Sequence, residues 1–348
     1  LPDSRSRGEA PGAARRRDLS AREYIDGVLA GDRVVLARAI TLVESNAPAH
    51  QDLAQEVLTA LLPQRGASVR IGITGVPGAG KSTLVEALGT RLTARGHRVA
   101  VTAVDPSSTV SGGSVLGDKT RMEKLAADPA AFIRPSPSGG TLGGVARKTR
   151  ETIVLFEAAG YDVVLIETVG VGQSEVVVRS MADLFLLVLI AGAGDELQGI
   201  KKGVVELADA VIVNKADGDG AQAALRARAE FERVLHYLRP ATEGWTTQAL
   251  AVSALTGEGL DPLWAMVGAF VGRTRQSGAF DRRRAEQERA WVRALVDEGL
   301  RERFRAHPAV AAAREALEAQ VVAGALPATL AARRLLDLFG GPGAGQGD

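Results

Sequence analysis

The chain contains no cysteine and only four histidines among its 348 residues. The absence of cysteine excludes disulfides, thiolate metal sites and cysteine nucleophiles. No two histidines have the spacing of metal ligands, so each is expected to be an ordinary surface or cap residue. Long hydrophobic runs are also missing. The longest, Leu184 to Ala193, is about half a membrane span and is better explained as a strand covered on both faces.

The formal net charge of +1 gives the chain no overall field of either sign. Nucleic acid and anionic membranes are therefore not expected as partners. No signal-peptide pattern opens the sequence, so the expected compartment is the cytoplasm.

Apolar runs alternate with helical patterns between Val69 and Phe270. They predict strands at 69–74, 98–104, 131–134, 161–167, 184–190, 210–213 and 249–252. Strands that alternate with helices indicate an α/β fold with a mostly parallel, doubly wound sheet. Ligands of such sheets bind at the carboxyl ends of the strands.

The rest of the chain is organised around this α/β part, which is assigned to residues 66–275. Residues 1–17 are rich in Arg, Gly, Pro and Ser, and they are predicted to be disordered. Residues 18–65 have helical spacing, with Ser20 and Asp32 as predicted N-caps. Residues 276–340 are charged and helical, and the glycine-rich tail 341–348 is predicted to be flexible.

The segment from Gly75 to Thr83 fits the phosphate-loop pattern G-x-x-x-x-G-K-[ST] between a predicted strand and a predicted helix. Its residues are Gly75, Val76, Pro77, Gly78, Ala79, Gly80, Lys81, Ser82 and Thr83. The glycines let backbone N–H groups turn around the β-phosphate, and the helix N-terminus adds positive charge. Lys81 is predicted to bridge the β- and γ-phosphates, and the Ser82 hydroxyl to bind Mg²⁺. The alternative is a glycine-rich turn with a chance lysine, and the agreement of motif and context disfavours it.

The stretch Asn214-Lys215-Ala216-Asp217 follows another apolar strand and points to guanine as the base. A carboxylate at Asp217 can accept hydrogen bonds from guanine N1–H and the 2-amino group, which adenine lacks. Lys215 is expected to cover the base, and Asn214 to tie this loop to the phosphate loop. Ser253, Ala254 and Leu255 follow the next strand and are similar to the loop whose backbone contacts guanine O6. The alternative is a polar turn after a strand.

Three further segments follow predicted strands and carry charged groups. Asp105 is expected at a strand tip near the γ-phosphate. Residues 112–122 offer Asp118 for Mg²⁺, directly or through water, and Arg121 for phosphate charge. Glu167 ends a buried strand where G proteins usually carry Asp, and the Gly170 backbone N–H is expected to respond to the γ-phosphate. The alternative is an N-cap or turn for each acidic residue, and a solvated helix residue for Arg121.

The glutamine that orients water in Ras-like proteins is missing from its usual position. Val171 occupies that position, and Gln173 lies two residues later. Slow intrinsic hydrolysis is therefore expected, with another group needed for the charge of the transition state. Candidates are Arg121 and the lysines of loop 192–202, Lys201 among them.

Five long motifs occur together in one known family: V-D-P-S-S-T, G-G-S-x-L-G-D-K-T-R-M, I-R-P-S-P-S-x-G-T-L-G-G-V-A, E-T-V-G-V-G-Q-S-E and G-A-G-D-E-L-Q-G-I-K-K-G. Over roughly residues 20–340 the chain resembles the MeaB-like G-protein chaperones of adenosylcobalamin-dependent acyl-CoA mutases. The resemblance implies a P-loop GTPase that gates cofactor delivery to the mutase and protects or reactivates it. The human relative serves methylmalonyl-CoA mutase.

The same resemblance implies particular roles for residues and for the helical ends. It implies a Mg²⁺ and switch shell made of Ser82, Asp105, Asp118 and Glu167. It also implies that residues 195–201, with Asp195, Gln198 and Lys201, couple GTP or GDP to the partner. The N- and C-terminal helices would build a homodimer.

Several alternatives stay open from sequence alone. The partner could be a methylmalonyl-, isobutyryl-, hydroxyisobutyryl- or ethylmalonyl-CoA mutase. GTPases that insert nickel or cobalt use Cys and His ligands, whereas this chain has no cysteine and no pair of histidines with ligand spacing. An amino-acid transport ATPase or kinase would use ATP, which conflicts with the guanine recognition predicted from Asn214–Asp217. A pure binding module would use nucleotide only as a clamp, and phosphate release in a single turnover would separate it from an enzyme.

Overall fold

Seven parallel strands form one sheet in a computed structural model, which describes residues 19–64, 66, 68–104, 122–136, 142–168, 174–191 and 202–340. The strand order is β3-β2-β4-β1-β5-β6-β7. The strands are β1 (Val69–Gly75), β2 (Val99–Val104), β3 (Ala131–Arg134), β4 (Val163–Thr168), β5 (Leu184–Ile190), β6 (Ala210–Asn214) and β7 (Gln248–Ala251). The predicted α/β class is confirmed. The central strands are buried along almost their whole length, which explains their continuous apolar runs.

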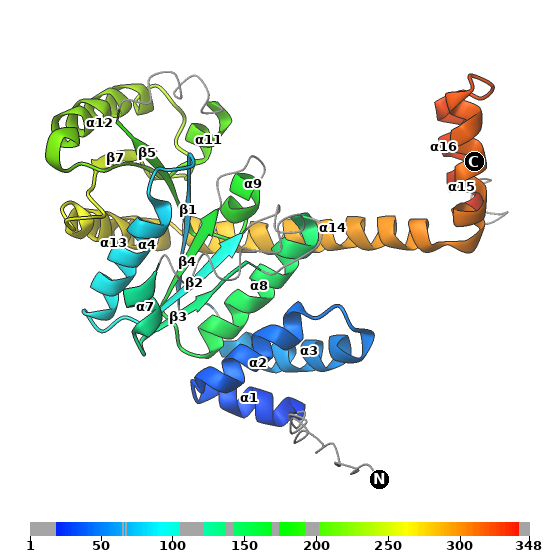
Figure 1. The fold of residues 1–348 in the computed structure, drawn as a ribbon, viewed down its shortest axis with the longest axis horizontal. Coiled ribbons are helices and arrows are strands. Elements are labelled where there is room, and N and C mark those ends of the chain that lie inside the picture. The colour runs from blue at the N-terminus through cyan, green and yellow to red at the C-terminus, as the bar shows by residue number, and fades with distance from the viewer. Residues whose placement is uncertain are drawn as a thin grey trace, which may run out of the picture.

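Helices cover both faces of the sheet (Figure 1). One face packs against α4 (Lys81–Thr93), α7 (Glu123–Ala127) and α13 (Leu260–Gln276). The other packs against α8 (Leu142–Ala158), α9 (Ser174–Arg179), α11 (Lys202–Leu207) and α12 (Ala221–Leu235). Short 3₁₀ turns occur at Leu62–Gln64 and Gly218–Gly220. All strands run in parallel, so their carboxyl ends meet at one edge, where the phosphate loop lies.

The N-terminal extension consists of α1 (Ala21–Leu29), α2 (Arg33–Glu44) and α3 (Pro48–Leu61), which pack on the outer side of α8 (Figure 1). Both predicted N-caps are confirmed. Ser20 forms a capping box with Glu23, and Asp32 accepts hydrogen bonds from the backbone N–H groups of Val34 and Val35.

The C-terminal part leaves the body as one long helix, α14 (Ala279–Ala306), which carries α15 (Pro308–Val322) and α16 (Ala328–Gly340) at its far end (Figure 1). A small apolar cluster around Leu317, Leu326 and Ala331 holds α15 and α16 together. In the described part of the chain, no helix combines the length and apolarity that a bilayer crossing requires.

Candidate nucleotide site

The phosphate loop joins β1 to α4 through glycines that no other residue could replace without strain. Gly75 has φ of 152°, and a Cβ placed there would lie 2.0 Å from the carbonyl oxygen of Val188 on β5. Gly80 has φ of 82°, and its Cβ would lie 2.7 Å from Nδ2 of Asn214. The loop therefore lies directly against β5 and β6, as a backbone cradle for phosphate requires.

Lys81 begins α4 and is 7% exposed. Its Nζ donates hydrogen bonds to the carbonyl oxygens of Gly75, at 2.9 Å, and Val76, at 3.2 Å. Burial lowers the pKa of the Lys81 ammonium group, and the carboxylates of Glu167 and Glu175 oppose this shift. The ammonium group is thus folded back across the loop that the sequence predicts to hold phosphate.

Two oxygen donors from distant parts of the sequence meet next to this lysine. The Ser82 hydroxyl donates to Oε1 of Glu167 at 2.7 Å. Glu167 is 7% exposed and is held opposite Ile73 by the pairing of β4 with β1. A hydroxyl and a carboxylate are hard oxygen ligands of the type that Mg²⁺ binds, with water and phosphate oxygens filling the other positions. The residues that the structure describes contain no group of three or more His, Cys, Asp or Glu able to hold a metal.

Asn214 ends β6, is 1% exposed, and joins two loops. Its Nδ2 donates to the carbonyl oxygen of Ala79 at 2.8 Å, and its Oδ1 accepts from the backbone N–H of Ala254 at 3.1 Å. The predicted tie between the phosphate loop and the base loop is therefore present as direct hydrogen bonds.

The predicted base loop is held by a second contact. The Ser253 hydroxyl donates to Oδ2 of Asp217 and accepts from the backbone N–H of Thr256 at 3.0 Å. Lys215 adopts φ of 60°, a conformation rare for a side-chain-bearing residue. Leu255 is 81% exposed, so it borders an open region. The residues predicted to read guanine thus lie together, next to the phosphate loop.

The other predicted site residues fall outside the described residues: Asp105, Asp118, Arg121, Gly170, Asp195, Gln198 and Lys201. β2 ends at Val104, β4 at Thr168 and β5 at Ile190, all at the carboxyl edge of the sheet.

Two features near the phosphate loop were not predicted from the sequence. Oγ1 of Thr74 lies 2.9 Å from Oγ1 of Thr168, and both residues are fully buried. This contact links the start of the phosphate loop to the end of β4. Glu175, on α9, acts electrostatically on Lys81. Its position eight residues after Glu167 gave no signal, because only the fold brings the carboxylate of Glu175 near the ammonium group of Lys81.

Comparisons with known proteins agree with this geometry. The sequence profile of the family described as methylmalonyl Co-A mutase-associated GTPase MeaB matches residues 36–309. A Caulobacter vibrioides protein that carries a GTPase name is 57% identical over 313 residues, which span 90% of this chain and 96% of that protein. The mouse methylmalonic aciduria type A homolog, mitochondrial, is 46% identical over 323 residues, covering 90% of this chain and 78% of that protein. The solved structure of a LAO/AO transport system kinase matches with a TM-score of 0.75 and 38% identity, covering 92% of this chain and 98% of that one.

Proposed function

The chain belongs to the methylmalonyl-CoA mutase-associated GTPase MeaB family, and from this premise we propose that its GTP hydrolysis gates the loading of adenosylcobalamin onto an acyl-CoA mutase and protects or reactivates that enzyme. Guanine-nucleotide binding and GTP hydrolysis follow from the family and its named relatives. The observation that best supports a guanine-nucleotide switch is the double contact of Asn214 with the phosphate loop and the predicted base loop.

In the proposed site, Lys81 moves from its carbonyl partners to the β- and γ-phosphates when nucleotide binds. Burial of its ammonium group makes this favourable, because a desolvated cation gains more from phosphate oxygens than from neutral carbonyls. Asp217 and Ser253 hold the guanine edge, while the stem of Lys215 covers its face. Discrimination against adenine comes from the Asp217 carboxylate, which adenine would leave unpaired.

Mg²⁺ would be held by Ser82 and Glu167, with Asp105 and Asp118 completing its shell. When bound, it supplies positive charge to the β- and γ-phosphate oxygens. The hydrogen bond between Ser82 and Glu167 supports this assignment, since it holds a hydroxyl oxygen and a carboxylate oxygen 2.7 Å apart. Gly170 is assigned to γ-phosphate sensing through its backbone N–H.

The proposed partner of this GTPase is methylmalonyl-CoA mutase or a related adenosylcobalamin enzyme, as the family description suggests. Residues 195–201, with Asp195, Gln198 and Lys201, are assigned to partner coupling. In the sequence they lie between β5 and α11. A cytoplasmic location stays a prediction.

The proposal includes a homodimer built with the terminal helices. Support comes from α14, where Val292, Val296 and Leu300 are 60%, 54% and 50% exposed. Their four-residue spacing places them on one side of the helix, and no described residue of the same chain covers this apolar side. A second copy of the chain would bury it.

The decisive experiment is GTP hydrolysis measured with and without the mutase, in single and multiple turnover. Slow phosphate release alone and a clear acceleration by the mutase are expected, because Val171 cannot orient water. Lys201→Ala should remove most of the acceleration while sparing GDP affinity, since a group needed in the transition state contributes little to ground-state binding.

Arg121→Ala is the parallel variant. Loss of acceleration there, with normal acceleration in Lys201→Ala, would move the catalytic role to Arg121. Normal acceleration in both would place the group on the partner. No acceleration of the wild-type protein by any adenosylcobalamin-dependent mutase would contradict the proposal.

A further inference from the structure

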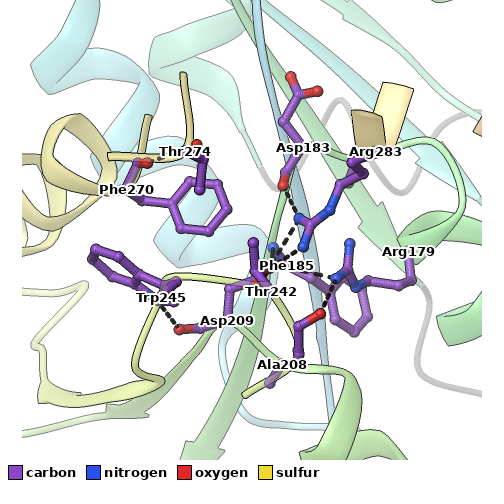
Figure 2. A network of polar contacts seen from close by, with 12 residues as sticks. Arg179, Asp183, Phe185, Ala208, Asp209, Thr242, Trp245, Phe270, Thr274 and Arg283 are labelled. Carbon is purple, nitrogen blue, oxygen red and sulfur yellow. Dashed lines mark hydrogen bonds and ion pairs between the residues drawn. The ribbon is translucent and has the colours of Figure 1, made fainter. Parts of the chain in front are cut away.

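The base of the sheet, opposite the nucleotide edge, contains arginines that are matched by buried carboxylates (Figure 2). Figure 2 shows Arg179 and Arg283 pointing toward the same cluster around Asp209. Arg283 lies 3.3 Å and Arg179 lies 3.9 Å from the Asp209 carboxylate, and Arg284 contacts Asp183 at 2.6 Å. Such matching is expected, because an unpaired buried charge is costly. We call this set of residues the base network: Asp183, Asp209, Arg179, Arg283 and Arg284.

Arg150 of α8 is an exception to this matching. Its Nη2 donates to the carbonyl oxygen of Ser180 at 2.5 Å and to Oγ of the same residue at 3.1 Å. Its guanidinium carbon lies 4.9 Å from the ring centre of Trp291 on α14. Its Nε is buried and has no hydrogen-bond partner among the described residues. The contacts that the structure describes for Arg150 thus include no carboxylate.

A comparison with Arg70 shows what this guanidinium lacks. Burial lowers the pKa of Arg150 to about 10, and the Glu288 carboxylate only partly opposes this shift. Arg70, at the base of β1, is also buried, but Glu157 lies 2.8 Å from it. The hydrogen bond and charge of Glu157 outweigh burial there, and the pKa of Arg70 is raised. Arg150 is therefore a desolvated cation without the counterion that Arg70 has.

Arg150 borders a cavity of about 370 Å³. This volume lies at the small end of the range for ligand sites in proteins. Side chains from three helices line the cavity, among them Leu58 and Leu62 of α3, Arg147, Arg150 and Glu151 of α8, and Trp291 of α14. The cavity thus lies where the N-terminal extension, the α/β body and the C-terminal arm meet.

Positive charge exceeds negative charge in this cavity. Apart from Arg70, which is already paired, its charged groups are Arg147, Arg150, Glu151 and Glu288. Burial raises the pKa of Glu151 to about 7, so at pH 6 most of this carboxyl group is protonated. Two arginines then face one carboxylate, and one positive charge is in excess.

We propose that this cavity binds a small monocarboxylate with a compact apolar body, and that its carboxylate pairs with the guanidinium of Arg150. A carboxylate oxygen can accept the hydrogen bond that the buried Nε–H offers, and the planar guanidinium matches the planar carboxylate. One negative charge balances the one excess positive charge, whereas a phosphate dianion would also be repelled by Glu288. Leu58, Val154 and Met181 supply apolar walls for the rest of the ligand.

This site goes beyond the proposed function and does not depend on it. Arg70, which lines the cavity, lies at the start of β1, whereas the phosphate loop follows the end of the same strand. A ligand in the cavity would contact α3, α8 and α14 together.

The test is a titration of the full chain at pH 6 with 2-naphthoate and with its neutral analogue 2-naphthamide, followed by saturation-transfer NMR. The two compounds have nearly the same shape and differ in charge. The wild-type protein should bind 2-naphthoate at least about tenfold more tightly, because only the carboxylate forms a charge-assisted hydrogen bond with Arg150.

Arg150→Met removes the guanidinium and keeps an unbranched side chain. It should bind 2-naphthoate at least about tenfold more weakly and lose the preference for the carboxylate, while urea unfolding shows that the variant is folded. Arg273→Gln is the matched control. Arg273 also lies over a tryptophan, 5.7 Å from the ring centre of Trp245, but it is exposed and lies outside this lining. This control should bind 2-naphthoate as the wild type does.

Thr59→Trp is the second variant, in case Arg150→Met does not fold. Thr59 is exposed on α3 and lines the cavity, so an indole there should fill part of the space without changing Arg150. Both compounds should then bind more weakly than to the wild type.

Several outcomes would overturn the site and leave the proposed function intact. Equal affinity of the wild type for the two compounds, or unchanged 2-naphthoate binding in a folded Arg150→Met, would remove Arg150 as the carboxylate receptor. Unchanged binding in Thr59→Trp, or no binding to the wild type, would show that the cavity does not accept the ligand. Displacement of 2-naphthoate by an equal concentration of inorganic phosphate would contradict the choice of a monocarboxylate.

Discussion

Removal of the Asn214 side chain should weaken nucleotide binding strongly. In Asn214→Ala, the carbonyl oxygen of Ala79 and the backbone N–H of Ala254 both lose a partner, at a place where Asn214 itself is 1% exposed. Each buried group left unpaired costs about 1–3 kcal/mol. The expected total is about 2–4 kcal/mol, because water can reach part of the opened space.

This free energy should appear mainly as lost affinity, because the two hydrogen bonds hold the phosphate loop and the predicted base loop at a fixed separation. A loss of 2–4 kcal/mol corresponds to about a 30- to 700-fold rise in the dissociation constant. Isothermal titration calorimetry with GDP and with GTP measures it, and urea unfolding of the nucleotide-free protein shows how much of the effect is general stability. Asn46→Ala is the matched control, since Asn46 is an exposed residue between α2 and α3.

Asn214→Asp gives an internal check. The carboxylate can still accept from Ala254, but it presents an oxygen to the carbonyl groups of Ala79 and Gly80, where the amide donated. It should therefore bind GDP more weakly than Asn214→Ala. If both variants bound GDP within about threefold of wild type and unfolded at the same urea concentration, the two loops would be positioned by other contacts and the reasoning would be wrong.

Three further outcomes are expected. Asp217→Asn should lower GTP affinity and raise affinity for xanthosine triphosphate, and unchanged GTP binding in a titration would remove Asp217 from base recognition. Ser82→Ala and Glu167→Ala should slow Mg²⁺-dependent hydrolysis by about 100-fold while GDP affinity changes less. Turnover at the wild-type rate in Glu167→Ala would mean that Glu167 has only a structural role at the end of its strand. Burial raises the pKa of Glu151 from 4.5 to about 7. Between these pH values the folded state keeps a proton that the unfolded state releases. The free energy of unfolding should therefore fall as pH rises from about 4.5 to 7. Glu151→Gln should then be more stable than wild type by about 1–2 kcal/mol at pH 8 and equal at pH 4 in urea unfolding. The exposed control Glu318→Gln should show no such difference between the two pH values.

The sequence alone determined the type of fold and the identity of the loops. A parallel sheet covered on both faces requires continuous apolar strands, so β1, β5 and β6 were visible as runs of Val, Ile and Leu. The phosphate loop was visible because its glycines are needed for backbone conformations that other residues avoid, as at Gly75. These signals are local, because each requirement restricts the types of residues that are adjacent in the sequence.

The meeting of distant residues was decided by the tertiary structure. Ser82 and Glu167 are 85 positions apart, and Asn214 and Ala79 are 135 apart; only the strand order β4-β1-β5-β6 brings them to one edge. The base network of Asp183, Asp209 and the α14 arginines gave no motif at all. An aspartate before a strand has the same local sequence whether it faces water or a buried arginine, and the packing of α14 against the sheet determines which of the two it meets.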